Sequence, residues 1–81
     1  MTTDYAPMAT VYTLPMCQKC NLTTQHLQKL GIPYETVDLS EDPVARQHIK
    51  DTYGFATAPV VVTEDDVWCD YKPDKIKALA R

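Results

Sequence analysis

Two cysteines separated by two residues, Cys17 and Cys20, carry the most evident chemistry in this sequence. A Cys-x-x-Cys pair can close a small reversible disulfide ring, or it can supply half of a tetrahedral zinc site. The disulfide alternative needs a first thiol of lowered pKa, whereas the zinc alternative needs two further ligands. The residues around the pair decide between these two functions.

A zinc site would have to recruit Cys69 together with either His26 or His48. Neither histidine stands at a zinc-finger spacing from the cysteines, and both are expected in helices, as surface residues. We therefore expect no metal site. A half zinc site, or a pair of inert thiols, is the alternative interpretation for Cys17 and Cys20.

The segments that flank the pair predict that it lies at the start of a helix. Residues 10–13 are β-branched and aromatic, and Pro15 follows them, which favours a strand that stops there. A helical spacing then continues as far as Gly31, through Cys20, Thr23, Leu27 and Leu30. At a helix N-terminus, unpaired backbone N–H groups and the helix dipole favour an anion, which lowers the pKa of the first thiol. Cys17 is therefore the predicted nucleophile, and Cys20, one turn inside, is the second thiol.

The rest of the sequence predicts three further strands and two further helices. The strands are expected over residues 34–39, 58–63 and 67–69, and the helices begin at Asp42-Pro43 and at Pro73. Only a short acidic turn, more typical of a solvated hairpin tip than of a calcium loop, separates the last two strands, so these are antiparallel. The predicted order is β-α-β-α-β-β-α, an α/β fold with a mixed four-stranded sheet and three flanking helices. With a redox-type Cys-x-x-Cys after the first strand, this order predicts the thioredoxin fold.

Composition limits the classes of function. The 81 residues, 44% hydrophobic and 23% charged, are typical of one small globular domain, expected over residues 9–81 behind a flexible extension at residues 1–8. No apolar run approaches the roughly 20 residues that span a bilayer, and no signal peptide is recognisable, so a cytoplasmic protein is expected. A net charge of −3 without a basic cluster argues against nucleic-acid binding. Three cysteines are too few for a secreted disulfide framework.

Three segments together resemble the NrdH-redoxin family, the glutaredoxin-like electron donors of class Ib ribonucleotide reductase. They are residues 12–20 with the cysteine pair, residues 57–61 with an Ala-Pro step, and residues 68–74 with Trp and Lys-Pro-Asp. The resemblance spans residues 9–81. It implies a thiol-disulfide oxidoreductase that is reduced by thioredoxin reductase rather than by glutathione, and that reduces ribonucleotide reductase or another disulfide protein. We expect a monomer that needs no cofactor of its own.

The resemblance also implies roles for residues outside the pair. In this fold the proline at Pro59 is cis and faces the cysteines, which implies that Ala58 offers backbone hydrogen bonds to a substrate. The alternative is a proline that only begins a strand. Trp68 is expected either to pack in the core or to contact a partner. Cys69 replaces a serine of the family, and it is either an inert strand residue or a thiol able to form an alternative disulfide.

Two positions depart from the pattern of the family. Leu14 stands where the family usually has lysine, which leaves Lys19 as the nearest candidate to support the charge of the thiolate. Asp70 stands where the family favours glycine. In glutaredoxins a glycine pair near this point lets the backbone approach glutathione, so the bulk and charge of Asp70 predict poor glutathione binding. The alternative functions are a glutathione-dependent glutaredoxin, a metal- or iron–sulfur-binding module that uses the pair, and a redox-inactive binding module.

Overall fold

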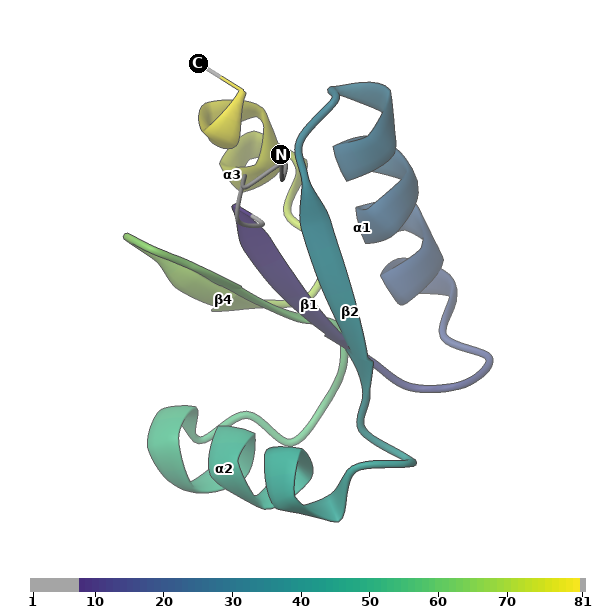
Figure 1. Cartoon of the computed structure of the whole chain (residues 1–81), viewed down its shortest axis with the longest axis vertical. Coiled ribbons are helices and arrows are strands. Elements are labelled where there is room, and N and C mark those ends of the chain that lie inside the picture. Colours follow the sequence, from purple (N-terminus) through teal and green to yellow (C-terminus); the bar gives the residue numbers. More distant parts are fainter. Residues whose placement is uncertain (1–7, 81) are drawn as a thin grey trace, which may run out of the picture.

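The computed structural model describes residues 8–80 of the chain (Figure 1). The element order is β1 (Ala9–Thr13), α1 (Gln18–Lys29), β2 (Tyr34–Asp38), α2 (Pro43–Tyr53), β3 (Val60–Thr63), β4 (Val67–Cys69) and α3 (Pro73–Leu79). This is the predicted order, with small differences at the ends of strands. The predicted flexible extension, apart from Met8, lies outside the described residues. No helix among residues 8–80 is long and apolar enough to cross a membrane.

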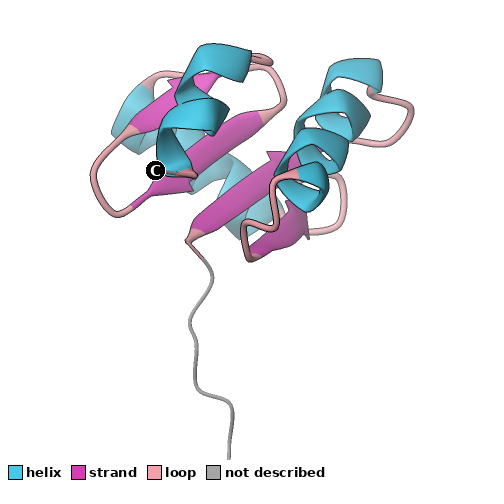
Figure 2. Cartoon of the chain, turned by 90° about the horizontal axis from the view of Figure 1, so that it is seen from above, coloured by secondary structure: helices cyan, strands magenta, loops and turns pink. Residues whose placement is uncertain are grey.

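The four strands form one mixed sheet in the order β2-β1-β3-β4. Strand β1 runs parallel to β2 and antiparallel to β3, and Val11 is opposite Thr36 on one side and Val61 on the other. Strand β4 is antiparallel to β3 and forms one edge of the sheet. Figure 2 shows this sheet flanked by the helices, and Figure 1 shows α2 apart from α1 and α3. The predicted mixed sheet and thioredoxin fold are confirmed.

The main core lies between the sheet and helices α1 and α3. Its buried members come from both layers, and they are Ala9, Val11, Leu27, Ile32, Val61, Trp68 and Ile76. Side chains alternate between the two faces of a strand, so Val61 enters this cluster, whereas its equally buried neighbour Val60 faces the opposite side. Burial of each large aliphatic side chain contributes about 2 kcal/mol. The cluster therefore fixes α1, and with it the cysteine pair, against the sheet.

Short sequence signals set the ends of α2. The Oδ1 atom of Asp42 accepts a hydrogen bond from the backbone N–H of Ala45 at 3.0 Å, and Pro43 occupies the first turn. Gly54 ends the helix with a φ of 75°, in the left-handed region that glycine adopts without steric cost. The predicted cap, proline and glycine of this helix are confirmed.

One part of the prediction for α1 is wrong. Leu30 was expected on the inward face, but its side chain is exposed. The helix ends at Lys29, and Leu30 is already the C-cap residue, followed by Gly31 with a φ of 71°. The chain leaves the helical path at this point, so the helical spacing no longer determines where Leu30 points.

We predict that Leu27→Ala lowers the free energy of unfolding by about 2 to 5 kcal/mol, because the change leaves a cavity among fully buried side chains. Leu22→Ala is the matched control, since it makes the same substitution on the exposed side of α1. The control should cost less than about 0.5 kcal/mol. Urea unfolding followed by circular dichroism measures both variants. Equal losses in the two would contradict the core described above.

Candidate active site

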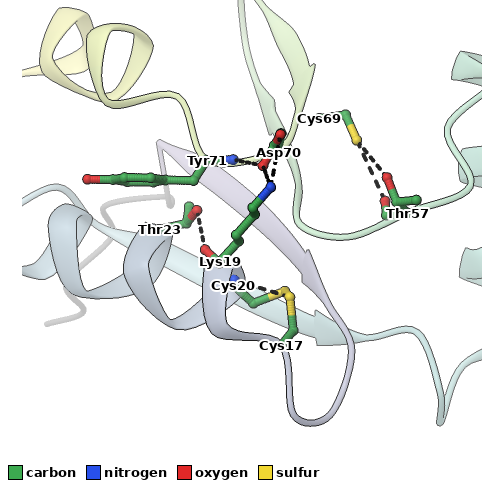
Figure 3. A network of polar contacts seen from close by, with 8 residues as sticks. All are labelled: Cys17, Lys19, Cys20, Thr23, Thr57, Cys69, Asp70 and Tyr71. Carbon is green, nitrogen blue, oxygen red and sulfur yellow. Dashed lines mark hydrogen bonds and ion pairs between the residues drawn. A yellow bond between two sulfur atoms is a disulfide. The ribbon is translucent and has the colours of Figure 1, made fainter.

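The cysteine pair lies at the N-terminus of α1. Cys17 and Cys20 form a disulfide across the first turn (Figure 3). Cys17 is the N-cap residue, and its Sγ atom accepts a hydrogen bond from the backbone N–H of Cys20 at 3.2 Å. The first turn of α1, all of it among the described residues, contains no acidic side chain. The unpaired N–H groups and the positive end of the helix dipole are thus available to a negative charge on the Cys17 sulfur.

The two cysteines differ in exposure. Cys17 is partly exposed, whereas Cys20 is only 3% exposed. Behind them, the hydroxyl of the buried Thr23 donates a hydrogen bond to the carbonyl of Lys19 at 2.8 Å, which holds the first turn together. This asymmetry suits a first thiol that attacks a substrate and a second that is shielded until the mixed disulfide forms.

The Ala58–Pro59 peptide bond is cis, as the resemblance implied. The ring of Pro59 is fully buried, and Ala58 is partly exposed. No backbone–backbone hydrogen bond among residues 8–80 involves Ala58. Its N–H and carbonyl therefore have no backbone partner among the described residues, and the predicted role of Ala58 in substrate binding stays a prediction.

Asp70 occupies the turn between β4 and α3 with a left-handed φ of 82°. Glycine adopts this backbone conformation without steric cost, which agrees with the glycine that the resemblance implied at this position. The N–H of Asp70 donates to the carbonyl of Pro59, and its Oδ1 atom accepts from the N–H of Tyr71, both at 2.8 Å. The hydrogen bond from Tyr71, and after it that from Lys19, hold the pKa of the Asp70 carboxyl below its usual value. Asp70 is therefore charged at neutral pH.

Lys19 forms an ion pair with Asp70, with 3.2 Å between Nζ and Oδ1. Figure 3 shows the Lys19 side chain extended toward Asp70 and away from the disulfide. The expected support of the Cys17 thiolate by Lys19 stays a prediction. The sequence identified both residues as candidates but did not predict that they form an ion pair. Their opposite charges were the only signal of this contact.

Trp68 lies in the core. Its side chain is 3% exposed within the main cluster, and the ammonium of Lys75 lies 5.7 Å from the centre of its ring. The structure therefore favours the core alternative, because a partner docked on this surface would reach little of the Trp68 side chain.

Cys69 is a free thiol whose sulfur faces Thr57. Its Sγ atom lies 3.1 Å from the hydroxyl oxygen of Thr57 and 3.8 Å from the Thr57 carbonyl (Figure 3). Cys69 and the buried Trp68 are adjacent in β4, so their side chains point to opposite faces of the sheet. The sulfur of Cys69 is therefore in contact with Thr57, and the choice between an inert thiol and an alternative disulfide stays a prediction.

The two histidines lie as surface or half-buried residues, as expected. His26 forms a hydrogen bond with the hydroxyl of Tyr71 at 3.1 Å, a contact that sequence reasoning missed because the two residues are 45 positions apart. His48 is exposed and lies beside Thr52. Within residues 8–80, no three His, Cys, Asp or Glu side chains are grouped as metal ligands would be.

A reversible disulfide at a helix N-terminus, on a thioredoxin fold with a cis-proline loop, defines a thiol-disulfide oxidoreductase. The family model of glutaredoxin matches residues 9–68. The chain is 34% identical to the Gene 56 protein of Mycobacterium phage D29, over 98% of this chain and 88% of that protein. It is 30% identical to the glutaredoxin-like protein NrdH of Escherichia coli strain K12, over 86% of this chain and 85% of that protein.

The solved structure of NrdH-redoxin from Escherichia coli superposes with a TM-score of 0.84 and 30% sequence identity, over 88% of this chain and 92% of that one. The chain belongs to the glutaredoxin family, as a glutaredoxin-like redoxin of the NrdH type.

We predict that Cys69→Ser changes turnover in a disulfide-reduction assay by less than about twofold, because serine keeps a small polar group beside Thr57. Thiol titration checks the pairing. The oxidised wild-type protein should show the free Cys69 thiol, and the oxidised variant should show none. A large loss of turnover, or a thiol released from the active-site pair, would count for an alternative disulfide.

Proposed function

We propose that this protein carries electrons from thioredoxin reductase to a disulfide of a target protein, and that the target is ribonucleotide reductase. The choice of reductant rests on one observation, the anchored carboxylate of Asp70, which pairs with Lys19 of the Cys-x-x-Cys motif. The glutaredoxin-like NrdH-redoxin of Escherichia coli, whose structure is solved, has a thioredoxin-like activity profile. The same profile is proposed here.

The dithiol form of the pair does the chemistry. The Cys17 thiolate attacks one sulfur of the target disulfide, so that a Cys17–target disulfide forms and the other target sulfur leaves as a thiolate. The Cys20 thiol then loses its proton, and its thiolate attacks the Cys17 sulfur. The target leaves fully reduced, and the Cys17–Cys20 disulfide is restored. The reductase returns two electrons to this disulfide and so closes the cycle.

Glutathione is a poor fit for this site because its two carboxylates make it anionic. Asp70 is charged, and its backbone conformation and two hydrogen bonds keep its carboxylate at the edge of the site. Leu14, in the loop that leads to Cys17, supplies no positive charge, and the ammonium of Lys19 is already engaged by Asp70 rather than free for the carboxylates of glutathione. Repulsion and bulk at Asp70 therefore favour a protein reductant over glutathione.

The proposal includes a monomeric, cytoplasmic protein whose domain is residues 9–81. A pair that cycles between dithiol and disulfide needs a compartment in which thiols are kept reduced. The free thiol of Cys69 suits the same compartment.

The test is consumption of NADPH by the oxidised protein, with thioredoxin reductase in one reaction and glutathione with glutathione reductase in the other. We expect turnover with thioredoxin reductase at least about tenfold faster than with glutathione, a difference of about 1.4 kcal/mol. Cys17→Ser is the control and should be inactive in both reactions. Turnover with glutathione alone would overturn the proposed reductant and indicate a true glutaredoxin.

We predict that Cys20→Ser traps the target. The variant keeps the attacking thiol of Cys17 but lacks the thiol that resolves the mixed disulfide, so the complex with the oxidised target should accumulate. Non-reducing electrophoresis and mass spectrometry with purified ribonucleotide reductase measure the trapped complex, which dithiothreitol should release. The double variant Cys17→Ser/Cys20→Ser is the matched control. A redoxin that turns over with the reductase but traps no ribonucleotide reductase would require another target.

A further inference from the structure

We propose that Asp70 is a positioning residue for the redox reaction: its carboxylate holds the ammonium of Lys19 away from Cys17 and so limits how strongly Lys19 stabilises the Cys17 thiolate. The proposal concerns the chemistry of the pair itself and holds whichever protein reduces it or is reduced by it.

The carboxylate of Asp70 is anchored from both its backbone and its side chain. The N–H of Asp70 donates to the Pro59 carbonyl at 2.8 Å, and the left-handed φ of 82° fixes the direction in which the side chain leaves the turn. The Oδ1 atom accepts from the N–H of Tyr71 at 2.8 Å. The carboxylate is therefore a fixed negative charge.

Lys19 is the mobile partner of this fixed charge. It stands two residues after Cys17 in the first turn of α1, on a flexible four-carbon stem. Its Nζ atom lies 3.2 and 3.5 Å from the two carboxylate oxygens, and the two side chains are 61% and 50% exposed. Nothing buried has to move if the ammonium turns from Asp70 toward the active-site sulfur.

Reduction of the disulfide adds a second anion to the same neighbourhood. The Cys17 thiolate forms at the helix N-terminus, two residues before Lys19, so the ammonium of Lys19 then has a second negative group in its surroundings besides Asp70. Among the described residues, the charged groups that act on Asp70 are Lys19 on α1 and Lys72 in the turn after β4. Because Asp70 is charged at neutral pH, a thiolate at Cys17 must compete with it for the ammonium.

Asp70 can act on the thiolate in two ways that an experiment can separate. It can withhold Lys19, which requires the lysine, or it can repel the thiolate directly, which does not. The proposal is the first of these. Its signature is an effect of Asp70 that depends on Lys19, which a double-mutant cycle measures.

The measurement is the rate at which iodoacetamide alkylates Cys17 in the reduced protein, followed across pH and assigned by mass spectrometry. Alkylation needs neither a reductase nor a target, so its outcome is independent of the proposed partners. Asp70→Asn is the test variant, because asparagine tolerates a positive φ and keeps an oxygen for the Tyr71 N–H while it loses the charge. We expect alkylation below the pKa of the thiol to become roughly twofold faster, and 0.5 M salt to reduce the gain.

Asp66→Asn is the matched control. Asp66 also accepts a hydrogen bond from the next backbone N–H, that of Val67, at 2.8 Å, and it also pairs with a lysine, Lys75, at 2.8 Å. It lies in the turn between β3 and β4, where it has no contact with the cysteine pair. Its loss removes the same charge from the protein and should leave the alkylation profile unchanged.

The decisive comparison repeats Asp70→Asn in a Lys19→Gln background. We expect the gain in alkylation rate to fall by at least half there, because no ammonium is left to release. A gain that is equal or larger in the Lys19→Gln background would show direct repulsion alone and would overturn the proposal. Unchanged alkylation by Asp70→Asn in the wild-type background would overturn it as well.

Discussion

The structure depends on one constraint, that the first turn of α1 must present unpaired backbone N–H groups to a sulfur atom at its N-cap. Cys17 meets this constraint in the disulfide form, where its Sγ atom already accepts the hydrogen bond of the Cys20 N–H. A helix end of this kind is useful only if it is held still. The central strand β1 and the buried Leu27 on the inner face of α1 provide that support, because they fix the helix against the sheet.

The site also depends on the turn after β4, which is far from the cysteine pair in the sequence. Asp70 donates to the carbonyl of Pro59 and pairs with Lys19, so the turn after β4 joins the cis-proline loop to the first turn of α1. Polar contacts thus link three segments that are far apart in the sequence. Their alignment is polar, and it rests on a backbone conformation that few residues other than glycine adopt.

The sequence predicted those parts of the fold that depend on local signals. The capping Asp42, the Gly54 after α2 and the β-branched strands were all recognisable, because each acts through its immediate neighbours. The prediction for Leu30 was wrong, because periodicity does not reveal the residue at which a helix stops. The contacts that shape the site were beyond reach for a different reason: Lys19 and Asp70 are 51 positions apart, and only the folded sheet brings them together.

The role proposed for Asp70 requires that its ion pair with Lys19 be weak. An exposed ion pair contributes little to stability, as is expected for the pair of Asp66 with Lys75 elsewhere on the surface. An interaction of the same kind beside a reactive sulfur still changes the population of thiolate, because the thiolate and the thiol differ by a full charge. A buried, strong pair would remove Lys19 from the chemistry altogether. An exposed pair leaves the ammonium shared between a permanent anion and one that exists only in the reduced protein, and so links the surface charge of the turn to the redox state of Cys17.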